Sequence, residues 1–330
     1  MESPSGSALE APVSAFKQLV LARLRLLTLI GIALVLTIAF SMASSAFLTG
    51  SNFINIAVHS AVLAMLAIGM TFVILTGGLD LSVGSIVAFA GLLGVLVMQK
   101  TGSVSLGLVS AVLSGTLMGV VNGLLVGYLQ INAFIATIAT LAIYRGATLS
   151  ITEGSTISIT DPAFTFLGQR AIFGIPVIIF LLVILYAVFH LILKRTVFGR
   201  SVYAVGGSPA AARVAGVRVR LITLGVYVLS GTLAGICSIY VVGRLQSLQP
   251  WAGQGAEFET VVAVVLGGIN IAGGEGDLME SLVGVAIIAL ILNAMQLIPA
   301  IDPFFQAIVK GGIIIAALAI YERLKKFQVT

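Results

Sequence analysis

Charged residues are scarce in this 330-residue chain, because Asp, Glu, Lys and Arg together account for only 9% of it. A soluble domain carries about 25% charged residues, most of them on its surface. Hydrophobic residues make up 59% of the chain, and the mean hydropathy is +1.17. The composition therefore excludes a water-soluble globular domain and predicts an all-α, polytopic membrane protein.

Residue types that build metal and catalytic sites are also rare, since the chain has one cysteine and two histidines. Cys237 lies in an apolar segment and suits a small packing residue, so neither a disulfide nor a cysteine-rich metal site can form within one chain. His59 and His190 show no metal-ligand spacing. No phosphate-binding G-x-x-x-x-G-K-[ST] loop and no assembled nucleophile is visible. We expect no enzyme activity and no metal or cofactor in this chain.

Apolar runs of about the 20 residues that a bilayer crossing needs predict ten membrane helices. They are expected near residues 26–46, 56–76, 81–98, 105–127, 131–150, 172–192, 221–242, 258–271, 281–298 and 304–321. The third and eighth are short and flanked by glycine pairs. Residues 1–25 are predicted to form a cytoplasmic tail, and residues 26–330 a transmembrane domain with one long cytoplasmic connection at 194–220.

The formal net charge of +5 indicates topology and not a nucleic-acid partner, because the basic residues form short clusters between apolar stretches. Twelve of the seventeen basic residues fall into three clusters that ten crossings place on one face of the membrane. The clusters hold Lys17, Arg23 and Arg25, then six residues from Lys194 to Arg220, and then Arg323, Lys325 and Lys326. Lys and Arg are enriched in cytoplasmic loops, so both termini are predicted to be cytoplasmic.

The stretch Thr76 to Ser85, T-G-G-L-D-L-S-V-G-S, places Asp80 between two strongly apolar segments. A carboxylate at bilayer depth is unfavourable by several kcal/mol, so Asp80 should face protein, a cavity or the interface. Backbone N–H groups with Ser82 or Ser85 are expected to hold it. Asp80 either caps a broken helix at its N-terminus or contacts a polar substrate, and the sequence leaves both open.

A second segment resembles the first at an offset of 190 residues, with Gly77 to Leu81 matching Gly267 to Ile271. Broken or short helices are therefore predicted near Asp80 and Asn270, and such paired interruptions point towards the central pathway of a transporter. Asn293 and Gln296 share one helix face, where their amides meet either a hydroxylated solute or a neighbouring helix. The candidate pathway residues are Asp80, Ser82, Ser85, Asn122, Asn132, Phe134, Asn270, Asn293 and Gln296.

In the connection at 194–220, Ser208 is a suitable N-cap, Pro209 suits the first helical position and Gly216 suits a helix stop. These signals predict a short amphipathic helix at the membrane surface. From the residues alone, such a helix either enters a groove on a partner protein or lies against anionic lipid headgroups.

Three separated motifs resemble the permease subunits of ribose-type bacterial sugar ABC importers. The first is Gly69-Met70-Thr71 continued by G-G-L-D-L-S-V-G-S, and the second is F-G-R-S-V-Y-A-V-G-G-S-P-A-A-A-R-V-A-G-V from Phe198 to Val217. The third is A-V-V-L-G-G-I-N-I-A-G-G-E-G from Ala263 to Gly276. The resemblance covers nearly all of the chain after residue 50. The chain departs from the family pattern after the third motif. Family members commonly have a basic residue there, whereas this chain has Glu275, Asp277 and Glu280.

The resemblance implies a ten-helix subunit of a bacterial inner-membrane importer that pairs with a second copy or a related permease. It also implies a periplasmic sugar-binding protein and a cytoplasmic ATPase subunit, which would hold the ATP and Mg²⁺. The expected ATPase-coupling residues are Arg200, Gly206, Gly207, Pro209, Ala211, Ala212, Arg213 and Gly216. The expected contacts with the binding protein are Arg170, Arg244, Gln246 and Glu257, whereas Trp251 also suits a membrane-interface anchor.

The predicted function is import of a monosaccharide or small polyol by alternating access. An ion-coupled secondary transporter or channel is the alternative, but it should carry several buried carboxylates, and this chain offers mainly Asp80. An integral-membrane enzyme would need a cluster of acids, histidines or metal ligands, and the sequence shows none.

Overall fold

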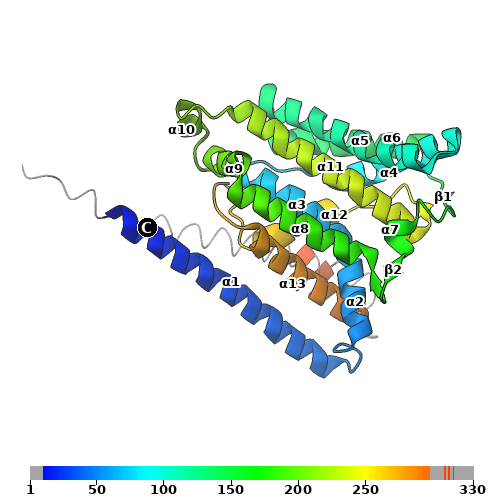
Figure 1. The fold of residues 1–330 in the computed structure, drawn as a ribbon, viewed down its shortest axis with the longest axis horizontal. Coiled ribbons are helices and arrows are strands. Elements are labelled where there is room, and N and C mark those ends of the chain that lie inside the picture. The colour runs from blue at the N-terminus through cyan, green and yellow to red at the C-terminus, as the bar shows by residue number, and fades with distance from the viewer. Residues whose placement is uncertain (1–9, 298–307, 310, 313–314, 316–330) are drawn as a thin grey trace, which may run out of the picture.

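The computed structural model describes residues 10–297, 308, 309, 311, 312 and 315, with side chains from residue 26 onward, and these residues are mostly helical (Figure 1). The long helices are α1 (Glu10–Ala43), α4 (Val83–Thr101), α5 (Val104–Gly123), α6 (Ala133–Thr152), α8 (Val177–Arg195), α11 (Val219–Leu245) and α13 (Leu278–Leu297). The shorter helices are α2 (Gly50–His59), α3 (Ala61–Leu75), α7 (Phe166–Gln169), α9 (Val197–Gly207), α10 (Pro209–Val214) and α12 (Ala256–Leu266). A π-helical turn, η1 (Leu124–Tyr128), continues α5.

The strands are two residues each and join connections between helices. β1 (Ile157–Ser158) pairs antiparallel with β4 (Ser247–Leu248), and Ile157 lies opposite Leu248. β2 (Ala171–Ile172) pairs antiparallel with β3 (Ile175–Pro176), which leads directly into α8.

Seven of the described helices, the long ones named above, have the length and apolar composition to cross a membrane. The predicted second crossing is the pair α2 and α3, which is bent by 47° and makes an eighth if it is one span. The predicted eighth crossing is shorter than expected, because α12 has 11 residues and ends at Leu266. Almost all of the last expected crossing, 304–321, lies outside the described residues.

Small residues set the packing of α5 against α11. An added Cβ at Gly119 would overlap the carbonyl oxygen of Tyr227, and one at Gly123 would lie 2.7 Å from Leu224 Cδ1. Gly115 likewise has no room, since its Cβ would lie 2.5 Å from the carbonyl oxygen of Gly231. Close backbone approach stabilises helix pairs in lipid, where there is no hydrophobic drive between helices. The four-residue glycine spacing therefore serves packing.

Helix α3 lies in the centre of the described bundle, and only Val62 among its residues is not buried. By contrast, α1 and α8 expose many large apolar side chains, as expected of helices that face lipid.

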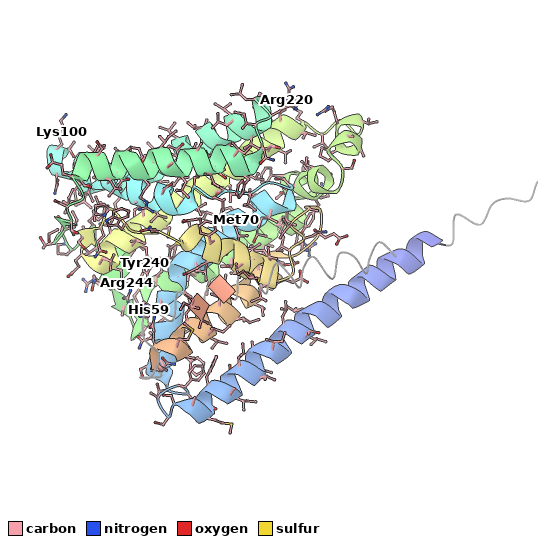
Figure 2. All side chains as sticks on the ribbon, turned by 180° about the vertical axis from the view of Figure 1, so that it is seen from behind. His59, Met70, Lys100, Arg220, Tyr240 and Arg244 are labelled. Carbon is pink, nitrogen blue, oxygen red and sulfur yellow. The ribbon has the colours of Figure 1, made fainter. Side chains whose placement is uncertain are left out.

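The two ends of the bundle differ in what they carry. Helices α9 and α10 lie at one end, which we call the α10 end, and α7, β1 and β2 lie at the other, the α7 end (Figure 1). Figure 2 places Arg220 at the α10 end and Lys100 and Arg244 at the α7 end. Arg220 belongs to the basic clusters that the sequence places on one face of the membrane, whereas Lys100 and Arg244 lie outside those clusters.

Candidate functional site

Helices α3 and α12 end in the same way. After α3, the N–H of Gly78 bonds the carbonyl of Val73 and the N–H of Gly77 bonds that of Ile74. After α12, Ile269 and Gly268 make the equivalent bonds to Val264 and Val265. This is a Schellman cap, which needs one residue with left-handed backbone, supplied by Gly77 (φ 78°) and Gly268 (φ 101°).

Aligning the two segments on their caps shifts the repeat found in the sequence by one position. Gly77 is the first glycine of its pair, whereas Gly268 is the second of Gly267-Gly268. The structural correspondence is therefore shifted by one residue from the sequence match. After each cap the chain is not helical until α4 or α13 begins.

Three segments that are distant in the sequence meet at what we call the glycine junction, made of Leu75, Gly77, Gly206, Gly273 and Gly274. The N–H of Gly274 donates to the carbonyl of Leu75 at 2.9 Å. An added Cβ at Gly206 would overlap that same carbonyl oxygen, and one at Gly273 would lie 2.7 Å from the backbone nitrogen of Gly77. The end of α9 thus touches the last residue of α3 and the chain beyond α12.

Asp80 is fully buried between α3 and α4 and is held by three hydrogen bonds. Its Oδ1 accepts from the backbone N–H of Ser82 (3.1 Å) and from the Ser82 hydroxyl (2.6 Å), and its Oδ2 accepts from the Ser230 hydroxyl (2.8 Å). Ser82 is the N-cap residue of α4, so Asp80 closes the turn before the helix and does not itself cap it. Of the two serines expected to hold Asp80, Ser82 does so, whereas the Ser85 hydroxyl donates to the carbonyl of Ser82.

Asn122 of α5 joins this cluster, because its Nδ2 donates to the Ser82 hydroxyl at 2.7 Å. Its Oδ1 is buried without a hydrogen-bond partner. The tertiary structure thus brings Asp80, Ser82 and Asn122 together, and it adds Ser230 of α11, which the sequence reasoning missed. Ser230 carried no local signal beyond being a hydroxyl in an apolar helix.

Asn132, Asn270 and Asn293 make hydrogen bonds outside the cluster around Asp80. Asn132 caps α6 by accepting from Phe134 N and Ile135 N, and the Asn270 side chain accepts from Ala272 N. Asn293 and Asn52 exchange two amide hydrogen bonds of 2.9 and 3.0 Å, so Asn293 serves contact between helices. Phe134 and Gln296 have exposed side chains.

Arg145, in α6, holds the segment that leads into α12. Its guanidinium donates to the carbonyls of Pro250 (2.6 Å) and Ala252 (2.9 Å). Gly84 of α4 also contacts this segment, since an added Cβ there would overlap Gly253 O and Glu257 Oε2. Irregular backbone between membrane helices has to be satisfied by protein groups, and Arg145 supplies two of the donors.

Glu257 is buried and not at the outer surface where the sequence reasoning placed it, and its contact with a binding protein stays a prediction. Glu257 is 6% exposed and lies in the first turn of α12. Its Oε1 accepts from the N–H of Gly255. Glu257 Oε2 has no hydrogen-bond partner, and Arg145 supplies the electrostatic partner of the carboxylate. The error arose because the start of α12 is drawn into the bundle beside α4 and α6.

The other residues expected at the binding-protein face lie near the α7 end. Arg170 and Gln246 are exposed, Arg244 is half-buried, and the Trp251 side chain is exposed. The tip of the β2–β3 hairpin adds Phe173, which is 99% exposed. This surface mixes basic and apolar groups.

The predicted helix in the 194–220 connection is confirmed as α10. Ser208 caps it by accepting from the N–H of Ala211, and Pro209 occupies its first turn. Gly216 follows with a left-handed φ of 83°. The expected coupling residues that are exposed are Arg200, Gly207, Pro209, Ala211, Arg213 and Gly216. Ala212 is buried and Gly206 lies in the glycine junction, so the structure gives these two a packing role, and their expected part in docking stays a prediction.

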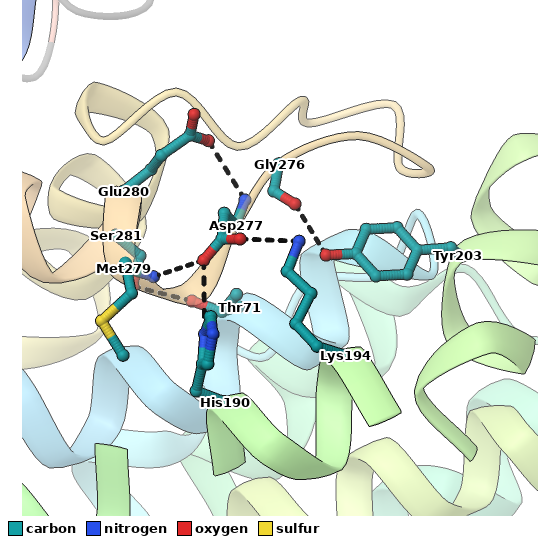
Figure 3. A network of polar contacts seen from close by, with 9 residues as sticks. All are labelled: Thr71, His190, Lys194, Tyr203, Gly276, Asp277, Met279, Glu280 and Ser281. Atoms are coloured by element: carbon teal, nitrogen blue, oxygen red, sulfur yellow. Dashed lines mark hydrogen bonds and ion pairs between the residues drawn. The ribbon is translucent and has the colours of Figure 1, made fainter. Parts of the chain in front are cut away.

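The acidic residues near residue 277 form a capping box with an ion pair (Figure 3). Asp277 Oδ1 accepts from the N–H of Met279 at 2.8 Å, and Glu280 Oε2 accepts from the N–H of Asp277 at 3.1 Å. The other oxygen of Asp277 lies 2.6 Å from Lys194 Nζ. Asp277 and Glu280 therefore stabilise the N-terminus of α13.

Comparisons with known proteins agree with the motif resemblance. A protein-family model described as branched-chain amino acid transport system / permease component matches residues 52–318. The ribose import permease protein RbsC of Haemophilus influenzae is 38% identical over 292 residues, covering 87% of this chain and 90% of that protein. No solved structure matches the chain.

Two further relatives are as similar. The L-arabinose transport system permease protein AraH of Escherichia coli is 37% identical over 292 residues, which is 88% of each chain. The ribose import permease protein RbsC of Bacillus subtilis is 36% identical over 286 residues, 86% of this chain and 88% of that protein. This chain therefore belongs to the family of transport-system permease components that includes the ribose and L-arabinose import permeases.

Proposed function

We propose that this chain is the membrane-spanning permease subunit of an ABC importer that carries a monosaccharide into the cytoplasm. The observation that carries the proposal is the likeness to ribose and L-arabinose import permeases along 86–88% of the chain. The sugar is expected to be a pentose or a related small polyol. The chain itself carries out no chemical step, and a separate ATPase subunit binds Mg²⁺ and hydrolyses ATP.

In this proposal the α10 end faces the cytoplasm and meets the ATPase through the exposed residues of α9 and α10. The α7 end faces the periplasm, where Arg170, Arg244 and Gln246 meet the sugar-binding protein. Two permease subunits, identical or related, enclose the pathway, and both chain termini are cytoplasmic. Ten crossings per subunit are expected, with α12 and the segment after residue 297 completing the set.

Alternating access needs elements that move relative to one another without unfolding in the membrane. The two capped helix ends, after α3 and α12, are suited to such movement because their backbone groups are already satisfied by the caps. The polar cluster of Asp80, Ser82, Asn122 and Ser230 lies beside the first of them and is our candidate for contact with passing sugar hydroxyls. Such contacts should be weak, since a permease must release its solute.

Affinity purification of the chain from its native membrane, followed by mass spectrometry, tests the proposal. We expect an ATPase subunit and a periplasmic sugar-binding protein to copurify, and we expect uptake of D-ribose or L-arabinose into proteoliposomes that depends on ATP and on that binding protein. Recovery of the chain alone, with solute transport in liposomes that needs no ATP, would replace the proposal with an ion-coupled transporter or channel.

A further inference from the structure

The coupling segment, residues 194–220, and the nearby His190 of α8 lie against the turn before α13 (Figure 3). Lys194 Nζ at the end of α8 lies 2.6 Å from Asp277 Oδ2. The Tyr203 hydroxyl of α9 donates to the carbonyl of Gly276 at 2.7 Å. His190 Nδ1 lies 3.6 Å from the other oxygen of Asp277. Two neighbouring residues of one turn, Gly276 and Asp277, thus receive contacts from α8 and α9 together.

The contacts support one another geometrically. Lys194 Nζ also lies over the ring of Tyr203, 5.6 Å from its centroid, so the ion pair and the tyrosine hydroxyl are held in one arrangement. A few residues away, Gly206 of α9 packs against Leu75 and Gly274 in the glycine junction. The coupling segment therefore contacts the chain before α13 in two places. Polar groups meet Gly276 and Asp277, and the backbone of Gly206 packs against Gly274.

We propose that Lys194, Tyr203 and Asp277 are positioning residues that make α9 and the start of α13 move as one body when the ATPase acts on the coupling segment. The inference rests on the proposed function and adds the route by which movement reaches the membrane helices. Asp277 has two separable tasks, because Oδ1 caps α13 while Oδ2 pairs with Lys194. Helix α13 in turn contacts α3 through the hydrogen bond from Thr71 Oγ1 to Ser281 Oγ, at 3.0 Å.

The two tasks of Asp277 can be separated by substitution. Asp277→Asn keeps an oxygen that can accept from the Met279 N–H and removes the charge that pairs with Lys194. Lys194→Gln removes the other charge. Tyr203→Phe removes only the hydroxyl that reaches Gly276. Arg195→Gln is the matched control, since Arg195 is the exposed neighbour of Lys194 and carries the same charge.

The experiment uses the purified complex of permease, ATPase and binding protein in proteoliposomes, with D-ribose and L-arabinose as probes. It measures ATP hydrolysis with and without the binding protein, together with copurification of the ATPase and the melting temperature. We expect Lys194→Gln and Asp277→Asn each to lower the stimulation of hydrolysis by the binding protein about tenfold, and the double variant to be no worse than either, since contacting residues are not additive. Tyr203→Phe should lower it by about threefold, as expected for one neutral hydrogen bond.

In all these variants ATPase copurification and the melting temperature should stay at the wild-type level, and Arg195→Gln should behave as wild type. The proposal is overturned if the single variants keep full stimulation, if the double variant shows the product of the two single losses, or if Arg195→Gln causes the same loss. Loss of ATPase copurification in Lys194→Gln would also overturn it, because the pair would then serve docking. A wild-type chain that recovers no ATPase would contradict the proposed function itself.

Discussion

At Asp80, hydroxyl and backbone donors take the place of the water that a carboxylate has outside the membrane. Two donors come from Ser82, two residues along the chain, and one comes from Ser230, 150 residues away in α11. Both carboxylate oxygens thus accept hydrogen bonds inside the protein, as a buried carboxylate requires. The arrangement therefore links the turn before α4 to α11.

Asp80→Asn should destabilise the protein more than the same change at a surface turn. The amide has one acceptor oxygen where the carboxylate has two, so the hydrogen bonds donated by Ser82 and Ser230 cannot both be kept, at a cost of about 1–3 kcal/mol. The melting temperature of the purified chain in detergent measures the effect. Asp161→Asn is the matched control, because Asp161 is exposed and accepts from the backbone N–H of Ala163 in a similar turn. Equal melting temperatures for the two variants would contradict the role assigned to Asp80.

At the scale of elements, the end of α9 carries two glycines with different surroundings. Gly206 has no room for a side chain, whereas Gly207 has. Gly206 packs against the Leu75 carbonyl and the backbone of Gly274, whereas an added Cβ at Gly207 would meet nothing within 4 Å. The two glycines are adjacent in one helix and differ only in what surrounds them. Contact between α9 and the two capped helix ends depends on the first of them.

Gly206→Ala and Gly207→Ala should therefore have opposite effects. The methyl group at residue 206 would push α9 away from the glycine junction, and overpacking of this kind costs about 1–3 kcal/mol. At residue 207 alanine should be neutral or stabilising by about 0.5–1 kcal/mol, because glycine is the weaker helix former. Thermal unfolding of both variants, measured side by side, checks this. A Gly206→Ala protein as stable as wild type would show that the junction can open without penalty.

Element boundaries also explain which expectations failed. The sequence pattern placed a crossing at 258–271, but the structure begins α12 beside Arg145 and ends it in a cap at Gly267 and Gly268. Hydropathy counts apolar residues and does not register that the segment before a helix is held inside the bundle by a distant guanidinium. Glu257 was misplaced for this reason.

For the whole molecule, the charge distribution and the arrangement of helices agree on two different ends. The exposed basic residues Arg200, Arg213 and Arg220 belong to the α10 end. The α7 end carries the two short strand pairs and the hairpin tip at Phe173. An importer needs such asymmetry, because a different partner acts on each side of the membrane.

Labelling of single cysteines should establish the orientation. In a chain with Cys237→Ala, which removes the only cysteine, Phe173→Cys and Ala210→Cys place one thiol at each end. A membrane-impermeant maleimide is expected to label the first in spheroplasts and the second only in inverted vesicles. Each variant serves as the control for the other. Labelling of Ala210→Cys in intact spheroplasts would reverse the proposed orientation.

The sequence by itself determined the membrane class, most of the spans, the α10 signals and the family motifs, because each depends on local composition or on residues a few positions apart. Pairing of Asp80 with Ser230, the glycine junction, the burial of Glu257 and the Lys194 to Asp277 ion pair were decided only by the tertiary structure. Each joins segments far apart in the chain. Local periodicity records which face of a helix is apolar, but it holds no information on which distant group a polar side chain will meet.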